Sequence, residues 1–110
     1  MAWILLISAG LLEIIWVVAL KYSEGFTKLW PSLIFGVTAW ASFALLAQAI
    51  KVLPMGTAYA VWTGIGAVGV AIVGMVWFGE SASLIRLSCI LLIVVGIAGL
   101  KLSTSAGGLT

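Results

Sequence analysis

Glu13 is the only ionisable residue near the middle of any long apolar stretch of this sequence. An acid at the centre of a bilayer costs about 2.5–3.5 kcal/mol on insertion scales, so such residues normally face a cavity or a partner and mark a transport path. The cations that would pair with Glu13 structurally, such as Lys21 and Lys51, stand at the ends of the apolar stretches. We therefore predict a functional role for Glu13.

Small and aromatic residues accompany this acid. In a helix, Gly10 and Trp16 lie three positions before and after Glu13 and so share its face, while Tyr59 and Trp62 share a face elsewhere. An acid with aromatic planes around it suits an organic cation, through Coulomb attraction and cation–π contact. The alternative, that tryptophans form interfacial belts, fits those near the stretch ends better than Trp16 and Trp62.

Four continuous apolar stretches must position these residues. About 20 helical residues span a hydrocarbon core of about 30 Å, and a lipid-embedded backbone must satisfy its own hydrogen bonds. Pro31 and Pro54 stand where helices would begin, the position at which proline is best tolerated. The sequence predicts an all-α membrane protein, a single domain over residues 1–110 with transmembrane helices at about 3–20, 31–50, 54–78 and 84–102.

Composition excludes several classes of protein. Of the 110 residues, 65% are hydrophobic and 7% charged, whereas soluble domains carry about 25% charged residues. A soluble enzyme and a nucleic-acid binder are therefore not expected. The chain has no histidine, one cysteine (Cys89) and no phosphate-binding GxxxxGK[ST] loop. We expect no catalytic residues, no metal and no cofactor.

The cations are balanced between the two sides of the membrane. Lys51 and Lys101 fall on the side of the N-terminus, while Lys21, Lys28 and Arg86 fall on the other. With the α-amino group the count is three against three, so the usual cytoplasmic excess of Lys and Arg is missing. Four helices are also too few to surround a cavity and pack well. We predict that the chain inserts in both orientations and pairs as an antiparallel homodimer.

Glycines mark places of close helix approach. Gly10 leaves room beside the carboxylate, while Gly64 belongs to a ridge of small residues in the third stretch and Gly66 to an adjacent ridge. Such residues let transmembrane helices pack closely, and glycine pairs are also recurrent sites of helix kinks. A bend there, one turn from Trp62, would open one side of a site and close the other. Packing and hinging explain these glycines equally well.

From Trp3 to Ser103 the sequence resembles the small multidrug resistance family of bacterial proton-coupled exporters. The resemblance rests on Glu13 and on the motifs at residues 23–32, 41–43 and 56–66. Trp16 in Glu-Ile-Ile-Trp and the run at 53–59 resemble the guanidinium exporter branch. The loop at 23–32 resembles the branch that exports quaternary ammonium compounds.

The resemblance implies residue roles. It implies an antiparallel homodimer in which both Glu13 carboxylates face one site that binds protons and substrate. The residues implied to line this site are Trp16, Ser42, Tyr59 and Trp62. Helix four of the family carries dimer contacts through two glycines seven apart; here Gly96 matches the second, and Cys89 stands at the first.

The expected function is proton-coupled export of guanidinium across the bacterial inner membrane by alternating access. Guanidinium is planar, permanently charged and matched to carboxylates, and Ser42 and Tyr59 are expected to donate hydrogen bonds to the two carboxylates. One alternative is a multidrug exporter of quaternary ammonium cations, which offer no N–H donors. A second is a non-transporting membrane subunit, which leaves Glu13 unexplained, and a third is a channel, in which one gradient cannot drive another ion uphill.

Overall fold

The computed structural model describes residues 1–107, which form four helices. They are α1 (Ala2–Tyr22), α2 (Leu29–Ile50), α3 (Met55–Trp77) and α4 (Leu84–Gly107). Each contains a segment long and apolar enough to cross a membrane. Within residues 1–107 there is no strand. The prediction of four membrane-spanning helices is confirmed.

The helix ends follow local sequence. Because α2 begins at Leu29, Pro31 falls in its first turn, where backbone N–H groups have no partner within the helix. Pro54 directly precedes α3, and its carbonyl oxygen accepts a hydrogen bond from the backbone N–H of Ala58 at 2.9 Å. The last helix continues to Gly107, past the expected end near 102. Residues 108–110 lie outside the described residues.

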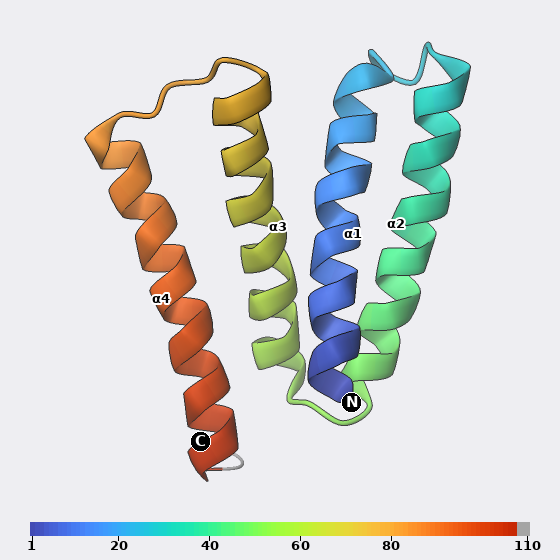
Figure 1. Ribbon diagram of the computed structural model, residues 1–110. Coiled ribbons are helices and arrows are strands. Elements are labelled where there is room, and N and C mark those ends of the chain that lie inside the picture. Colours follow the sequence, from blue (N-terminus) through green and yellow to red (C-terminus); the bar gives the residue numbers. More distant parts are fainter. Residues whose placement is uncertain (108–110) are drawn as a thin grey trace.

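The helices form an open row rather than a closed bundle (Figure 1). The first helix packs against both α2 and α3, whereas α4 packs along α3 and reaches α1 where Lys101 lies over the Trp3 ring. The α1–α2 and α3–α4 connections lie at one end of the row, and the N-terminus and the α2–α3 connection lie at the other. Lys28 and Lys51 therefore stand at opposite ends.

The buried core joins α1, α2 and α3, and the partly buried Ile97 and Leu100 of α4 pack against it. Three of its eight residues are alanines, whose small side chains let the helices approach closely. The core residues are Leu6, Ala9, Leu46, Ala49, Leu53, Ala58, Val61 and Trp62. By contrast, the membrane-spanning part of α4 has no buried residue. The first three helices thus form the unit that can position a site, and α4 flanks it.

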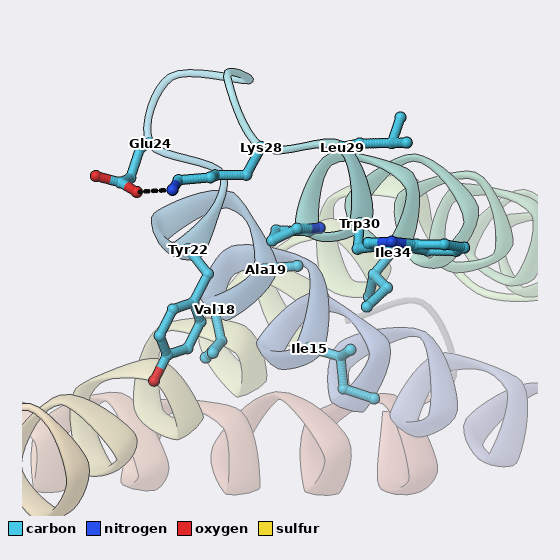
Figure 2. A pocket seen from close by; sticks show the side chains of 10 residues that line it. Ile15, Val18, Ala19, Tyr22, Glu24, Lys28, Leu29, Trp30 and Ile34 are labelled. Carbon is cyan, nitrogen blue, oxygen red and sulfur yellow. Dashed lines mark ion pairs between the residues drawn. The ribbon is translucent and has the colours of Figure 1, made fainter.

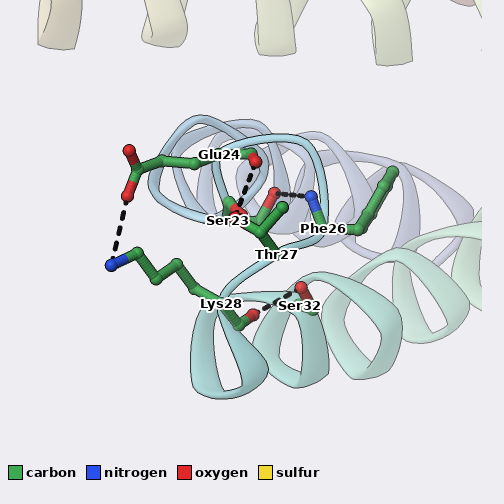
Figure 3. A network of polar contacts seen from close by, with 6 residues as sticks. All are labelled: Ser23, Glu24, Phe26, Thr27, Lys28 and Ser32. Carbon is green, nitrogen blue, oxygen red and sulfur yellow. Dashed lines mark hydrogen bonds and ion pairs between the residues drawn. The ribbon is translucent and has the colours of Figure 1, made fainter.

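A hydrogen-bonded turn joins α1 to α2 (Figure 3). The Ser23 hydroxyl, fully buried, donates to the Leu20 carbonyl at 2.6 Å and accepts from the Phe26 backbone N–H at 3.1 Å. The Thr27 hydroxyl lies 2.8 Å from the Glu24 carbonyl oxygen, to which it donates. These contacts hold the turn and so set α1, which carries Glu13, against α2.

Candidate functional site

Glu13 projects from α1 onto the glycine ridge of α3. A Cβ atom added at Gly66 would overlap the Glu13 carboxyl group. One turn earlier, a Cβ at Gly10 would lie 2.8 Å from the Ile65 side chain, so α1 also yields space to α3. The two helices therefore interlock around the acid, and Gly10 and Gly66 lie where they approach each other closely.

The carboxylate has both a buried and an open side. Its Oε1 atom is buried and has no hydrogen-bond partner among the described residues. The residue also borders a cavity of about 340 Å³. The other lining residues are Val17, Thr63, Gly66, Ala67, Val70, Ala71, Glu80 and Arg86. Because a buried polar group without a partner is costly, a proton or a cation arriving through this cavity would stabilise the site.

Ser42 links all three core helices through two hydrogen bonds. Its fully buried hydroxyl donates to the Ala9 carbonyl of α1 at 2.7 Å and accepts from the Trp62 indole N–H of α3 at 2.9 Å. The expectation that Ser42 donates to a Glu13 carboxylate is therefore not met in the single chain, because its only proton is already shared with Ala9. Ser42 instead fixes the indole of Trp62.

A chain of aromatic rings extends from Trp62 across α2. Its ring centroid lies 5.6 Å from that of Tyr59 and 5.4 Å from that of Phe43. Phe43 in turn lies 6.3 Å from Trp16, whose own indole nitrogen is buried without a hydrogen-bond partner among the described residues. The sequence analysis missed Phe43 as a site residue, although it lies directly beside Ser42.

The structure brings Trp16, Ser42, Tyr59 and Trp62 together, but on a different side of α1 from the Glu13 carboxylate. Trp16 turns toward Phe35 and Phe43 of α2, whereas Glu13 turns toward Gly66 of α3. Within one chain, none of those four residues lines the Glu13 cavity. Their predicted role as lining residues of a two-chain site stays a prediction.

An ion pair at the cavity was also missed from the sequence. The guanidinium Nη2 of Arg86 donates to the Glu80 carboxylate across 2.6 Å, and both residues line the same cavity as Glu13. Gly79 has φ +68° and ends α3 with a chain reversal, in which the Glu80 backbone N–H bonds the Gly74 carbonyl at 3.0 Å. A glycine just after a helix was the available signal for this reversal.

Comparison with known proteins identifies relatives along nearly the whole chain. Residues 1–93 match the family described as Small Multidrug Resistance protein. A protein of Escherichia coli strain K12 named guanidinium exporter is 62% identical over 104 residues, which are 94% of this chain and 99% of that protein. The chain belongs to the small multidrug resistance family. Two further relatives named guanidinium exporter match over the same length, which is 94% of this chain. The protein of Yersinia pseudotuberculosis is 62% identical over 100% of its own length, and that of Citrobacter freundii is 59% identical over 99% of its own length.

Family membership and the four apolar helices establish the setting of this small multidrug resistance protein. It is a multi-pass protein of the bacterial inner membrane. The relatives are named as exporters, which are transporters and not enzymes. Among the described residues, no three His, Cys, Asp or Glu side chains gather as metal ligands would.

Two more of the predicted packing glycines of this small multidrug resistance protein, Gly64 in α3 and Gly96 in α4, differ in what surrounds them. A Cβ at Gly64 would lie 2.8 Å from the Ile97 side chain, so Gly64 is where α3 receives α4. A Cβ at Gly96 would meet no atom of another helix within 4 Å. The predicted packing role of Gly64 thus has a contact within the chain, whereas that of Gly96 stays a prediction about a second copy.

A larger groove of about 650 Å³ lies beside the α1–α2 turn of this small multidrug resistance protein (Figure 2). Its lining is mainly aliphatic and aromatic, with residues such as Ile15, Tyr22 and Trp30. The charged residues at its rim, Glu24 and Lys28, pair with one another at 3.4 Å. Because both charges are already matched, this groove is a weaker candidate for binding a cation than the cavity beside Glu13.

Proposed function

We propose that the protein exports guanidinium in exchange for protons, with Glu13 as the residue that binds both. The observation that carries the proposal is the buried Glu13 Oε1, which lacks a hydrogen-bond partner among the described residues while its carboxylate borders a cavity. Relatives named guanidinium exporter, at 59–62% identity, support guanidinium as the cation. An intramembrane acid is the expected means of coupling proton movement to transport.

The working unit is an antiparallel homodimer. Lys21, Lys28 and Arg86 stand at one end of the molecule, opposite Lys51, Lys101 and the N-terminus, so positive charge gives little preference for one orientation. The apolar helix α4 packs along α3 and has no buried residue in its membrane-spanning part, which leaves most of its surface available to a second copy. Two oppositely inserted copies would enclose the space that the open row of helices in one chain leaves exposed.

In this dimer the two Glu13 carboxylates face one shared site. Guanidinium presents its N–H donors in a planar fork that carboxylates accept bidentately, and Trp16 and Trp62 cover its faces by cation–π contact. Ser42 holds the Trp62 indole in place through the 2.9 Å hydrogen bond. Tyr59 is 56% exposed in the single chain, so its hydroxyl is free to reach a carboxylate of the opposite copy.

Competition couples the two ligands. A proton or a guanidinium ion neutralises the Glu13 pair, and the dimer exchanges its inward-open and outward-open forms only when the pair is occupied. Because the two copies are identical and inverted, this change consists of each copy adopting the conformation of the other. The inward proton gradient therefore drives guanidinium outward through one site that is alternately exposed.

Replacing Glu13 by glutamine tests this function in purified protein reconstituted into liposomes. Wild type is expected to produce proton-coupled guanidinium currents, which Glu13→Gln loses while it still inserts and dimerises. Glu24→Gln, which removes an exposed acid outside the cavity, is the matched control and keeps the currents. Robust exchange by Glu13→Gln would refute the mechanism, and wild-type currents with tetra-alkylammonium but not with guanidinium would assign the protein to the multidrug alternative.

A further inference from the structure

The cavity beside Glu13 is elongated and has a charged end. Along α3 it is lined from Thr63 to Ala71, a separation of eight residues or about 12 Å at the helical rise. Its lining then includes Glu80 and Arg86, which belong to the α3–α4 connection and the first turn of α4. The cavity thus leads from the middle of α1 toward the end of the molecule at which the α1–α2 and α3–α4 connections lie (Figure 1).

The fold holds the Glu80 carboxylate over α3. The chain reversal at Gly79 returns Glu80 toward the helix, and its backbone N–H bonds the Gly74 carbonyl. A Cβ at Gly74 would overlap the Glu80 carboxyl group, so the missing side chain at Gly74 is what admits the carboxylate. Gly74 therefore receives Glu80 as Gly66 receives Glu13, and the two acids lie against glycines of one helix.

The partner of Glu80 is itself a guanidinium group. Arg86 binds the carboxylate through Nη2, and the two side chains are 33% and 46% exposed, respectively. Ion pairs exposed to this extent contribute about 0–1 kcal/mol, so a free guanidinium ion can compete with Arg86 for the same oxygens. A planar donor fork recognises carboxylates whether it belongs to a side chain or to a small ion.

We propose that Glu80 is an outer binding residue for the guanidinium substrate, and that Arg86 is an internal competitor which the substrate displaces before it reaches Glu13. This inference rests on the proposed function and adds a second acid to its path. Each of two inverted copies would carry one such outer site, so that each face of the membrane has one. Arg86, once displaced, is a cation beside the bound substrate and favours its movement inward, toward Glu13.

Neutralising each member of the pair in turn distinguishes this role from a structural one, because the two variants are expected to change the KM for guanidinium in opposite directions. Glu80→Gln removes the outer acceptor, and the KM for guanidinium is expected to rise about two- to fivefold, the factor that corresponds to an exposed ion pair. Arg86→Met removes the competitor, and the KM is expected to fall by a similar factor. A pair that only stabilises the fold predicts the same direction for both variants, because each breaks the same contact.

The Glu24–Lys28 pair supplies matched controls. It lies in the α1–α2 connection at the same end of the molecule, is exposed and does not line the Glu13 cavity. Glu24→Gln and Lys28→Met make the same charge changes, and both are expected to leave the KM unaltered. Lys28→Met also removes one cation from this end, so it controls for any effect of charge on membrane orientation.

The readout is the initial rate of guanidinium-driven proton movement in liposomes as a function of guanidinium concentration. Equal shifts in the control variants, or shifts of the same sign in Glu80→Gln and Arg86→Met, would overturn the proposal. If Arg86→Met does not yield folded protein, Arg86→Lys replaces it, since lysine keeps the charge without the bidentate fork, and its KM is also expected to fall. Absence of guanidinium transport by wild type would instead refute the proposed function.

Discussion

Replacing Ser42 by alanine tests the polar link that joins the three core helices. The change removes the acceptor of the Trp62 indole N–H and the donor to the Ala9 carbonyl. Trp62 is only 5% exposed and Ser42 is fully buried, so neither lost partner is replaced by water. The indole nitrogen is then a buried donor without an acceptor.

The size of the effect follows from these two bonds. A buried donor left unsatisfied costs about 1–3 kcal/mol in soluble proteins, whereas hydrogen bonds between transmembrane helices average about 0.6 kcal/mol and reach about 1.7. Ser42→Ala removes two such hydrogen bonds. The Ala9 carbonyl loses only the bond from Ser42, because it remains part of the α1 backbone. We therefore expect Ser42→Ala to lower the free energy of unfolding by about 1–2 kcal/mol.

Denaturant titration of the purified protein in detergent measures this difference. Ser88→Ala is the matched control, because the Ser88 hydroxyl is exposed and donates only to the Leu84 carbonyl within α4, at 2.8 Å. Guanidinium transport by Ser42→Ala is also expected to weaken, since Trp62 is no longer held. Equal stability of Ser42→Ala and Ser88→Ala would refute the inference that Ser42 fixes the indole.

Two further predictions concern Glu13 and membrane orientation. Gly66→Ala places a methyl group where the Glu13 carboxyl group lies, and is expected to lower kcat/KM for guanidinium by about tenfold or more. The control is Gly36→Ala, which adds a Cβ in open space and is expected to leave kcat/KM unchanged. A Gly66→Ala protein with full activity would contradict the assigned Glu13 geometry. A C-terminal reporter that is active on only one side of the membrane is expected to reveal both orientations in comparable amounts, and a signal from one side alone would contradict the antiparallel dimer.

The four helices could be predicted because each is a continuous apolar run interrupted by recognisable residues. Pro31 and Pro54 marked the beginnings of α2 and α3 to within two residues, because proline is tolerated only in the first turn. The end of α4 was less predictable. The small polar residues after Leu102 read as a tail, yet nothing in residues 103–107 prevents the helix from continuing to Gly107.

The candidate site was predictable in its residue types and less so in its contacts. Glu13 stood out because an acid is expensive within an apolar run. Helical spacing also placed Trp16 three residues from it, but could not show that Trp16 turns to α2 while Glu13 turns to α3. Such directions depend on how helices rotate against one another, which the spacing within one helix does not determine.

The Glu80–Arg86 pair shows the same limit for a connecting segment. The two residues are six apart, a spacing at which a continuous helix would not bring them face to face. They meet because Gly79 reverses the chain and Gly74 leaves room for the carboxylate. Which side chains meet across such a reversal depends on the backbone dihedral angles. In the sequence, the glycine is the only sign of these angles, so it indicates the reversal but not the ion pair.

The attachment of α4 has a consequence for how such a protein changes over generations. This helix rests on α3 through Gly64, and its Lys101 side chain lies over the Trp3 ring of α1, 5.4 Å from the ring centroid. Substitutions on its outer surface can accumulate without moving the acid or the rings that surround Ser42. In the proposed dimer, the outer surface of α4 beyond its first turn would determine the preference for a neighbouring chain, and natural selection can change it while it preserves the residues around Glu13 and Ser42.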